Sequence, residues 1–120
     1  MARYVRVKFK GKVILTKVKY CDTFFSRMLG LMFSSKLGHG EGAILVADRE
    51  SKEATSIHMF FVFFPLDVFW LDKGMRVVDV KRNIRPFVPL IVPNEKAKFV
   101  LETPVGSITG DVLGRTLEIR

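Results

Sequence analysis

The sequence of 120 residues predicts a mainly β domain, a jelly-roll-like β-sandwich or partly closed barrel with one short α-helix at about residues 23–32. Many short segments alternate apolar and polar residues and are separated by turn residues, as in sandwiches and barrels. Only one segment has the helical period. The length fits a single domain spanning residues 1–120, and a composition of 48% hydrophobic and 27% charged residues is typical of a globular protein.

The N-terminal segment predicts a β-hairpin. Apolar and basic residues alternate strictly over residues 3–9, which indicates a half-buried strand. Residues 10–12 give a turn signal, because their central glycine accepts a positive φ, and a second strand follows through residues 13–15. The apolar residues of this strand change phase before Val18, which predicts a β-bulge near Thr16.

One helix is predicted, with Thr23 as its N-cap. Phe24, Met28 and Leu31 recur at helical spacing after it. Gly30 weakens a helix interior, so we expect a close packing contact at this position, where a side chain would not fit.

The most apolar stretch runs from residue 57 to residue 72 and must form the centre of the core. Pro65 cannot donate to a β ladder, so two strands are expected, at 57–63 and 66–71. Since side chains of a strand alternate, some Phe rings of this stretch point away from one core. The helix, a proline-rich arm at 86–93 or a second subunit must cover them, so a homodimer is one open alternative.

The remaining elements follow from the same signals. Three proline residues make the arm at 86–93 irregular. We expect strands at 43–46, 76–80, 96–102 and 116–119, turns at 72–74 and 103–106, a glycine-bearing loop at 34–42 and a solvated loop at 48–53.

The composition limits where in the cell the protein is expected and which kinds of site it can contain. The longest run nearly free of charge, residues 56–66, is too short to cross a bilayer, and the N-terminus has no apolar leader, so a cytoplasmic protein is expected. A lone cysteine, Cys21, excludes an internal disulfide, and no metal site or cofactor is predicted. The absence of Gln, with Asn only at positions 83 and 94, indicates a thermostable protein.

The net charge of +8 raises the question of an anionic partner. The basic hairpin could bind nucleic acid through Lys8, Lys10, Lys12 and Lys17, with Tyr4, Phe9 or Tyr20 as stacking platforms. Lysines on an outer strand more often prevent edge-to-edge aggregation, and this interpretation is favoured.

Several short motifs, in this order and spacing, resemble the domain of unknown function 192 family, in its archaeal, thermophile-type form. The resemblance implies a jelly-roll-like β fold with one short helix, and a family without an established activity. The motifs are Arg27 with Gly30-Leu31-Met32, Gly42-Ala43-Ile44-Leu45, Pro65-Leu66-Asp67, Phe99-Val100-Leu101-Glu102 with Gly106, and Gly110-Asp111.

This chain departs from the family at one place. Relatives typically carry Trp-Met-Lys-Asn-Thr before the Pro-Leu-Asp step, whereas residues 58–62 here read His-Met-Phe-Phe-Val. A polar site built on the family's Asn and Thr is therefore not expected in this chain.

A few polar residues stand on otherwise apolar ground and form a candidate ligand site. A buried charge is costly unless it is paired, so Arg27 is expected to pair with Asp67 or Glu102, in a pocket walled by aromatic residues and Met32. In the alternative interpretation, Asp67 caps the turn after Pro65, Asp111 organises the turn at Gly110, and Glu102 holds a basic neighbour. The candidates are Arg27, His58, Asp67, Trp70, Glu102 and Asp111, with Phe60 and Met32 as further walls.

Two functions from different classes remain open. The first is a non-enzymatic accessory module that binds a small ligand or a protein, and the second is nucleic-acid binding through the basic hairpin. An enzyme is less favoured, because no nucleophile elbow or phosphate-binding loop is present.

Overall fold

A computed structural model describes residues 3–32, 34 and 37–120. The prediction of a mainly β domain with one short helix is confirmed. The elements are β1 (Arg3–Phe9), β2 (Lys12–Cys21), α1 (Phe24–Leu29), β3 (Glu41–Ser51), β4 (Leu66–Leu71), β5 (Val77–Ile84), β6 (Ala97–Pro104) and β7 (Glu118–Ile119).

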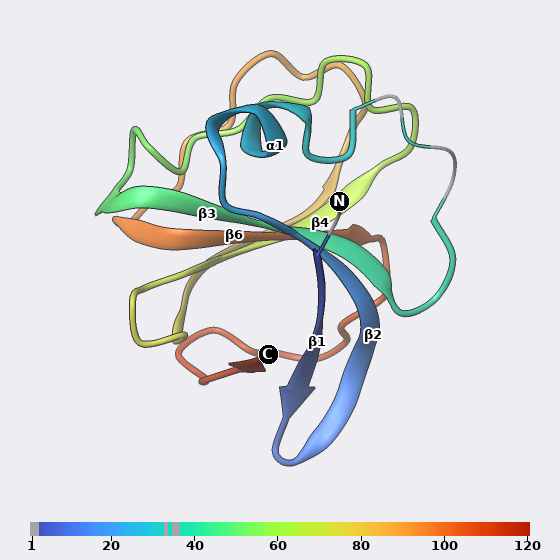
Figure 1. Ribbon diagram of the computed structural model, residues 1–120, viewed down its shortest axis with the longest axis vertical. Coiled ribbons are helices and arrows are strands. Elements are labelled where there is room, and N and C mark those ends of the chain that lie inside the picture. The colour runs from blue at the N-terminus through green and yellow to red at the C-terminus, as the bar shows by residue number, and fades with distance from the viewer. Residues whose placement is uncertain (1–2, 33, 35–36) are drawn as a thin grey trace.

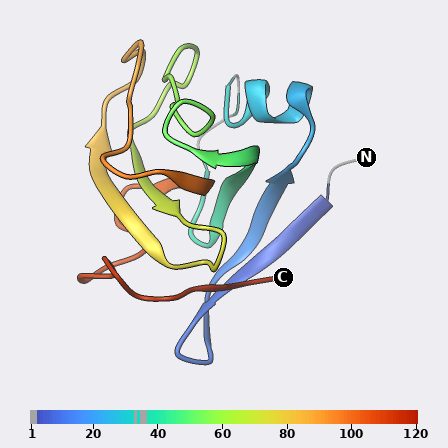
Figure 2. The ribbon, with the colours of Figure 1, turned by 90° about the vertical axis from the view of Figure 1, so that its left-hand side faces the viewer.

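Seven strands form one curved sheet in the order β5-β4-β6-β3-β2-β1-β7. Neighbouring strands are antiparallel except β2 and β3, which are parallel and are joined through α1. Figures 1 and 2 show how strongly the sheet curls, with α1 lying across it at one end and the β1–β2 hairpin projecting at the other. The sheet stays open. The segments that enter its two edge strands meet at a bridge between Arg76 and Thr116, next to backbone hydrogen bonds of Val77 with residues 114 and 115.

Apolar side chains cover both faces of the sheet. Strand β4 is buried along its whole length and shows the alternation of a strand packed on two sides. Phe69 and Leu71 belong to one cluster, whereas Val68 and Trp70 belong to a second cluster on the face that α1 covers. The apolar stretch is therefore central to the fold, as expected.

The N-terminal hairpin is present, and its first strand has the predicted bounds, whereas β2 begins at Lys12 and continues to Cys21. Lys10 and Gly11 both have positive φ, which gives the turn the twist of the flanking strands. The predicted bulge is present, because Val5 pairs with Val18 while Val7 pairs with Leu15. Two residues of β2 thus oppose the single residue between Val5 and Val7.

The helix is shorter than predicted. It ends at Leu29, and Gly30 follows with a φ of 44°, so the glycine terminates the helix and does not weaken its interior. Thr23 is the N-cap, as predicted, and shares a capping box with Ser26. The expected close contact at Gly30 is also present, since an added Cβ would lie 3.3 Å from the Oε1 atom of Glu102. The side chain of Phe24, assigned to the helix face above, lies outside the described part.

Two predictions of local structure are wrong. Residues 48–51 continue β3, because this charged segment pairs with β6 at Ser51 and Ala97. Residues 57–63 form a loop in place of a strand, because Met59 and Val62 close a turn and Phe61 has a φ of 57°. A positive φ departs from the extended backbone conformation of a regular strand.

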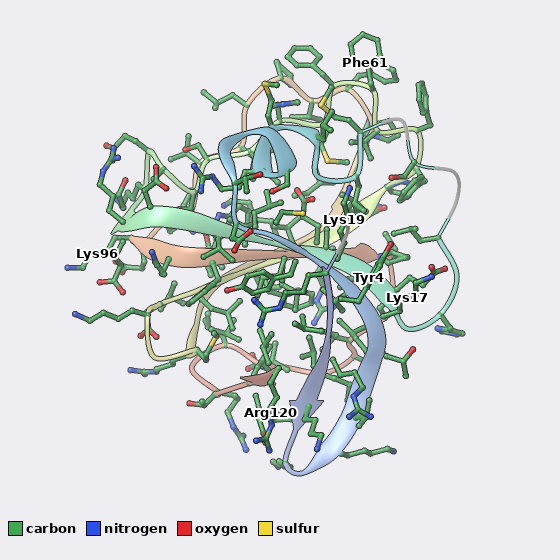
Figure 3. All side chains as sticks on the ribbon, viewed as in Figure 1. Tyr4, Lys17, Lys19, Phe61, Lys96 and Arg120 are labelled. Carbon is green, nitrogen blue, oxygen red and sulfur yellow. The ribbon has the colours of Figure 1, made fainter. Side chains whose placement is uncertain are left out.

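This loop pairs with the proline-rich arm, which is irregular as predicted. Ile57 forms a β-bridge with Ile91, and the backbone of Met59 bonds to residues 87 and 88. Met59 and Val62 are buried beneath, whereas several Phe rings of the loop stand outward, as Phe61 does in Figure 3. Phe87 of the arm packs against the rings of Phe61 and Phe63 in T-shaped contacts.

Among the described helices, none is long and apolar enough to cross a membrane.

Candidate functional site

A cavity of about 370 Å³ lies between α1, the β3 and β6 strands and the loop that enters the apolar stretch. We call it the α1 pocket. Three of the six candidate residues line it: Arg27, His58 and Glu102. The other wall residues are mostly apolar, namely Met28, Leu29, Leu31, Met32, Leu45, Ala47, Ala54, Ile57, Val62 and Val100, together with Gly30, Asp48, Arg49, Thr55 and Ser56.

The alternation of β6 directs Glu102 into the α1 pocket. Val100 belongs to the cluster beneath α1 and Leu101 to the opposite one, so the side chain of Glu102 returns to the α1 face. Its cross-strand neighbours are Ala43 on β3 and Val68 on β4. Because Ala43 is small and Gly30 has no side chain, the carboxyl group has room among apolar atoms.

The carboxyl group of Glu102 has no partner in the described part of the chain. The residue is 4% exposed, and no described side chain or backbone group donates a hydrogen bond to it or pairs with it. Every described side-chain oxygen or nitrogen that water cannot reach does have a partner. The unpartnered Glu102 oxygens must therefore still be reached from the α1 pocket.

Burial has a large effect on the acidity of this group. Removal from water disfavours the charged form and raises the pKa of Glu102 to about 8. At neutral pH the group is therefore mainly a neutral carboxylic acid, which has one donor and remaining acceptor capacity.

Arg27 lines the α1 pocket but is already engaged. Its Nη1 atom donates to the backbone oxygens of Val46 at 3.0 Å and Asp22 at 3.3 Å. It also forms an ion pair with Asp48 at 3.1 Å, and that carboxylate is largely exposed. The guanidinium thus ties α1 to the end of β2 and to β3, which fixes the roof of the pocket.

The remaining polar groups of the wall are partly used by the backbone. The Nδ1 atom of His58 accepts a hydrogen bond from the backbone N–H of Phe60 at 3.1 Å, so Nδ1 is already engaged by the backbone. The hydroxyl groups of Thr55 and Ser56 donate to backbone oxygens of residues 51 and 52. Glu102 is therefore the wall residue whose polar atoms are least satisfied by the protein.

The predicted pairing of Arg27 with Asp67 is wrong. Asp67 lies on β4, is 1% exposed and pairs with Arg82 at 3.3 Å. Its two oxygens also accept from the backbone N–H groups of Asn83 and Gly106, each at 2.9 Å. Asp67 holds the turn after β6 against β5, and Arg82, which sequence reasoning missed, is its partner. The pattern of apolar residues along the chain does not distinguish an exposed arginine on a strand, such as Arg82, from other surface residues.

Two more candidate residues, Asp111 and Trp70, form hydrogen bonds with the backbone and do not line the α1 pocket. Asp111 is exposed and accepts from the backbone N–H of Leu113, which is an Asx turn. Trp70 is fully buried, and its indole N–H donates to the backbone oxygen of Thr55 at 2.8 Å. Asp111 thus organises a local turn, as the alternative interpretation expects. Asp67 instead binds the turn after β6, and Glu102 has no basic neighbour within the described ranges.

Neither of the two aromatic residues expected in the pocket wall lines the cavity. Phe60 is exposed on the loop and Trp70 lies in the core beneath, whereas Met32 does line the cavity. The apolar side chains of the described wall are aliphatic or Met side chains.

The remaining chemistry-bearing groups show no second site. No group of three or more described His, Cys, Asp or Glu side chains could hold a metal ion. Burial raises the pKa of Cys21 to about 11, which makes its thiol unreactive.

The basic residues of the hairpin lie at the end of the molecule away from α1. Lys8, Lys10, Lys12 and Lys17 pair with no acid among the residues the structure describes. Lys17 lies 5.0 Å from the centre of the Tyr4 ring, so the ring proposed as a stacking platform is occupied by a cation (Figure 3).

Known proteins resemble this chain in sequence and in fold. A UPF0127 protein of Thermococcus sibiricus is 43% identical over 84% of this chain, and one of Thermococcus kodakarensis is 40% identical over 92%. The aligned regions make up 63% and 64% of those archaeal relatives, so the chain spans less than two thirds of their length. A solved structure from Sinorhizobium meliloti, 20% identical, has the same fold with a TM-score of 0.84 over 98% of this chain and 93% of that one. The profile of DUF192, described as an uncharacterized ACR family, matches residues 5–118, and the chain belongs to this family.

Proposed function

We propose that this domain is a non-enzymatic module that binds a small, largely apolar molecule in the α1 pocket. The observation that carries the proposal is the carboxyl group of Glu102, buried without a partner at the wall of an apolar cavity. A buried polar group without a hydrogen bond costs free energy, and a ligand group that bonds to Glu102 would recover that cost.

The shape and lining of the cavity favour a small molecule over a protein. Its volume of about 370 Å³ lies in the range of small-molecule sites, which are mostly apolar with a few placed polar groups. A binding role is favoured over catalysis because Arg27 is engaged by backbone oxygens and Asp48, and His58 by a backbone N–H.

The test is binding of the neutral fluorescent probe N-phenyl-1-naphthylamine. We expect its emission to rise with the unaltered chain and to lose that rise with Leu45→Trp, because Leu45 lines the cavity and an indole would fill it. Leu90→Trp is the matched control, since Leu90 is 64% exposed and lies outside the pocket. Met32→Trp provides a second filling variant if Leu45→Trp unfolds. Equal probe binding by folded filling variants and the control would refute the proposal.

A further inference from the structure

The charged groups of the α1 pocket are unequal in what they offer a ligand. Arg27, the half-buried cation of the wall, already has two backbone oxygens and Asp48 as acceptors. Arg49 is exposed at the rim. An anionic ligand would therefore find no unpaired buried cation in the described wall, and it would have to approach the carboxyl group of Glu102.

The Glu102 carboxyl group is the opposite case, because it is buried, points into the cavity and has no described partner. Its immediate surroundings are Gly30, Ala43, Leu45 and Val68, none of which has a polar side-chain atom. In surroundings of this kind an ion pair is much stronger than in water, provided that the partner brings its own hydrogen bonds.

We infer that the molecule bound in the α1 pocket is a small organic cation, a primary amine with an apolar body, whose ammonium group bonds to the Glu102 carboxylate. The inference rests on the proposed function and names the chemical class of its ligand. The aliphatic walls, which include Leu31, Met32 and Val100, would cover the apolar body.

A neutral alcohol or carbonyl compound would form weaker interactions with the Glu102 carboxyl group than an ammonium group would. It offers Glu102 one hydrogen bond and leaves the carboxyl group uncharged. An ammonium group supplies three donors and a full charge, and a hydrogen bond between two charged groups is about twice as strong as a neutral one.

Binding of a cation also has a proton balance. Burial raises the pKa of Glu102 to about 8, so the free protein holds a proton there at pH 7 and releases it to solvent when the ammonium group binds. The other titratable or charged groups around the pocket in the described chain are Cys21 on β2, Arg27 on α1, Asp48 and Arg49 on β3, and His58 on the loop. Cys21 stays protonated below its raised pKa of about 11.

The experiment compares n-hexylamine with 1-hexanol, which have the same apolar chain, by isothermal titration calorimetry at pH 6 and pH 9. We expect hexylamine to bind at least tenfold more tightly than hexanol at pH 9. Because affinity falls about tenfold for each pH unit below the pKa of Glu102, hexylamine should bind about a hundredfold more weakly at pH 6. Hexanol carries no charge, so its affinity should not rise between pH 6 and pH 9.

Variants assign the effect to one carboxyl group. Glu102→Gln keeps the shape and removes the charge, so it should abolish the preference for the amine while hexanol still binds. Asp111→Asn is the matched control, because it removes an exposed carboxylate outside the pocket. It should retain the preference of the unaltered chain.

The inference is overturned if hexylamine and hexanol bind equally, or if folded Glu102→Gln retains the preference for the amine. Proton release by the unaltered chain, measured at pH 7 in buffers of different ionisation enthalpy, needs no variant, and its absence would also overturn the inference. If the preference for hexylamine is absent but the unaltered chain still binds N-phenyl-1-naphthylamine, the pocket is a site for neutral ligands. If the unaltered chain does not bind the probe either, the proposed function itself is refuted.

Discussion

Replacement of Glu102 by Gln should stabilise the free protein in alkaline solution and have little effect in acid. The carboxyl group ionises in the unfolded chain with an ordinary pKa of 4.5, but burial raises the pKa to about 8 in the folded state. The folded state therefore binds more protons between these two values, so the unfolding free energy of the unaltered chain falls as pH rises from 4.5 to 8 and is constant above that. One pH unit corresponds to 1.36 kcal/mol, so the full loss is at most about 5 kcal/mol.

The neutral amide of Glu102→Gln does not titrate, so the unfolding free energy of the variant does not fall over this pH range for this reason. Urea denaturation at pH 5 and pH 9 measures the difference. We expect the two proteins to agree within about 1 kcal/mol at pH 5, and the variant to be more stable by several kcal/mol at pH 9. Asp111→Asn, on an exposed turn, should follow the unaltered chain at both values. A stability difference that is the same at pH 5 and pH 9 would show that Glu102 is not held in a desolvated site.

Two further predictions concern the other charged regions. Asp67→Ala leaves the backbone N–H groups of Asn83 and Gly106 without their acceptor and Arg82 without its partner, so denaturation should show a loss of about 3 kcal/mol. The same change at Asp111 should cost much less, and comparable losses would contradict the structural role of Asp67. For the hairpin, we expect no salt-dependent retention of single-stranded DNA or RNA in a mobility-shift assay at low salt. Retention that disappears when Lys8, Lys10, Lys12 and Lys17 are neutralised together would restore the nucleic-acid hypothesis.

Local patterns determined much of the strand content. The period-2 alternation over residues 3–9, the glycine turn after it and the phase change near Thr16 predicted β1, its turn and the bulge. Residues 66–71 were also predicted correctly, because Pro65 marks the start of β4 and the turn at 72–74 its end. These features depend on backbone sterics and on residues close in sequence, so a short segment of the chain is enough to predict them.

The errors lie where long-range pairing overrides local preference. The apolar residues 57–63 have strand-forming side chains, yet they form a loop because their backbone partner is the irregular proline-rich arm. The charged residues 48–51 look like a solvated loop, yet β6 lies beside them and continues the ladder.

The candidate site divides in the same way. The sequence by itself determined that Arg27, Asp67 and Glu102 are polar residues on apolar ground and must be paired or lie in a cleft. Only the tertiary structure decided which of these applies to each residue. Asp67 and Arg27 found partners on β5 and β3, whereas the Glu102 carboxyl group has none in the described chain, because α1 ends at Gly30 and leaves a cavity above it. Partner choice depends on which strands become neighbours across the sheet, and that is a property of the whole fold.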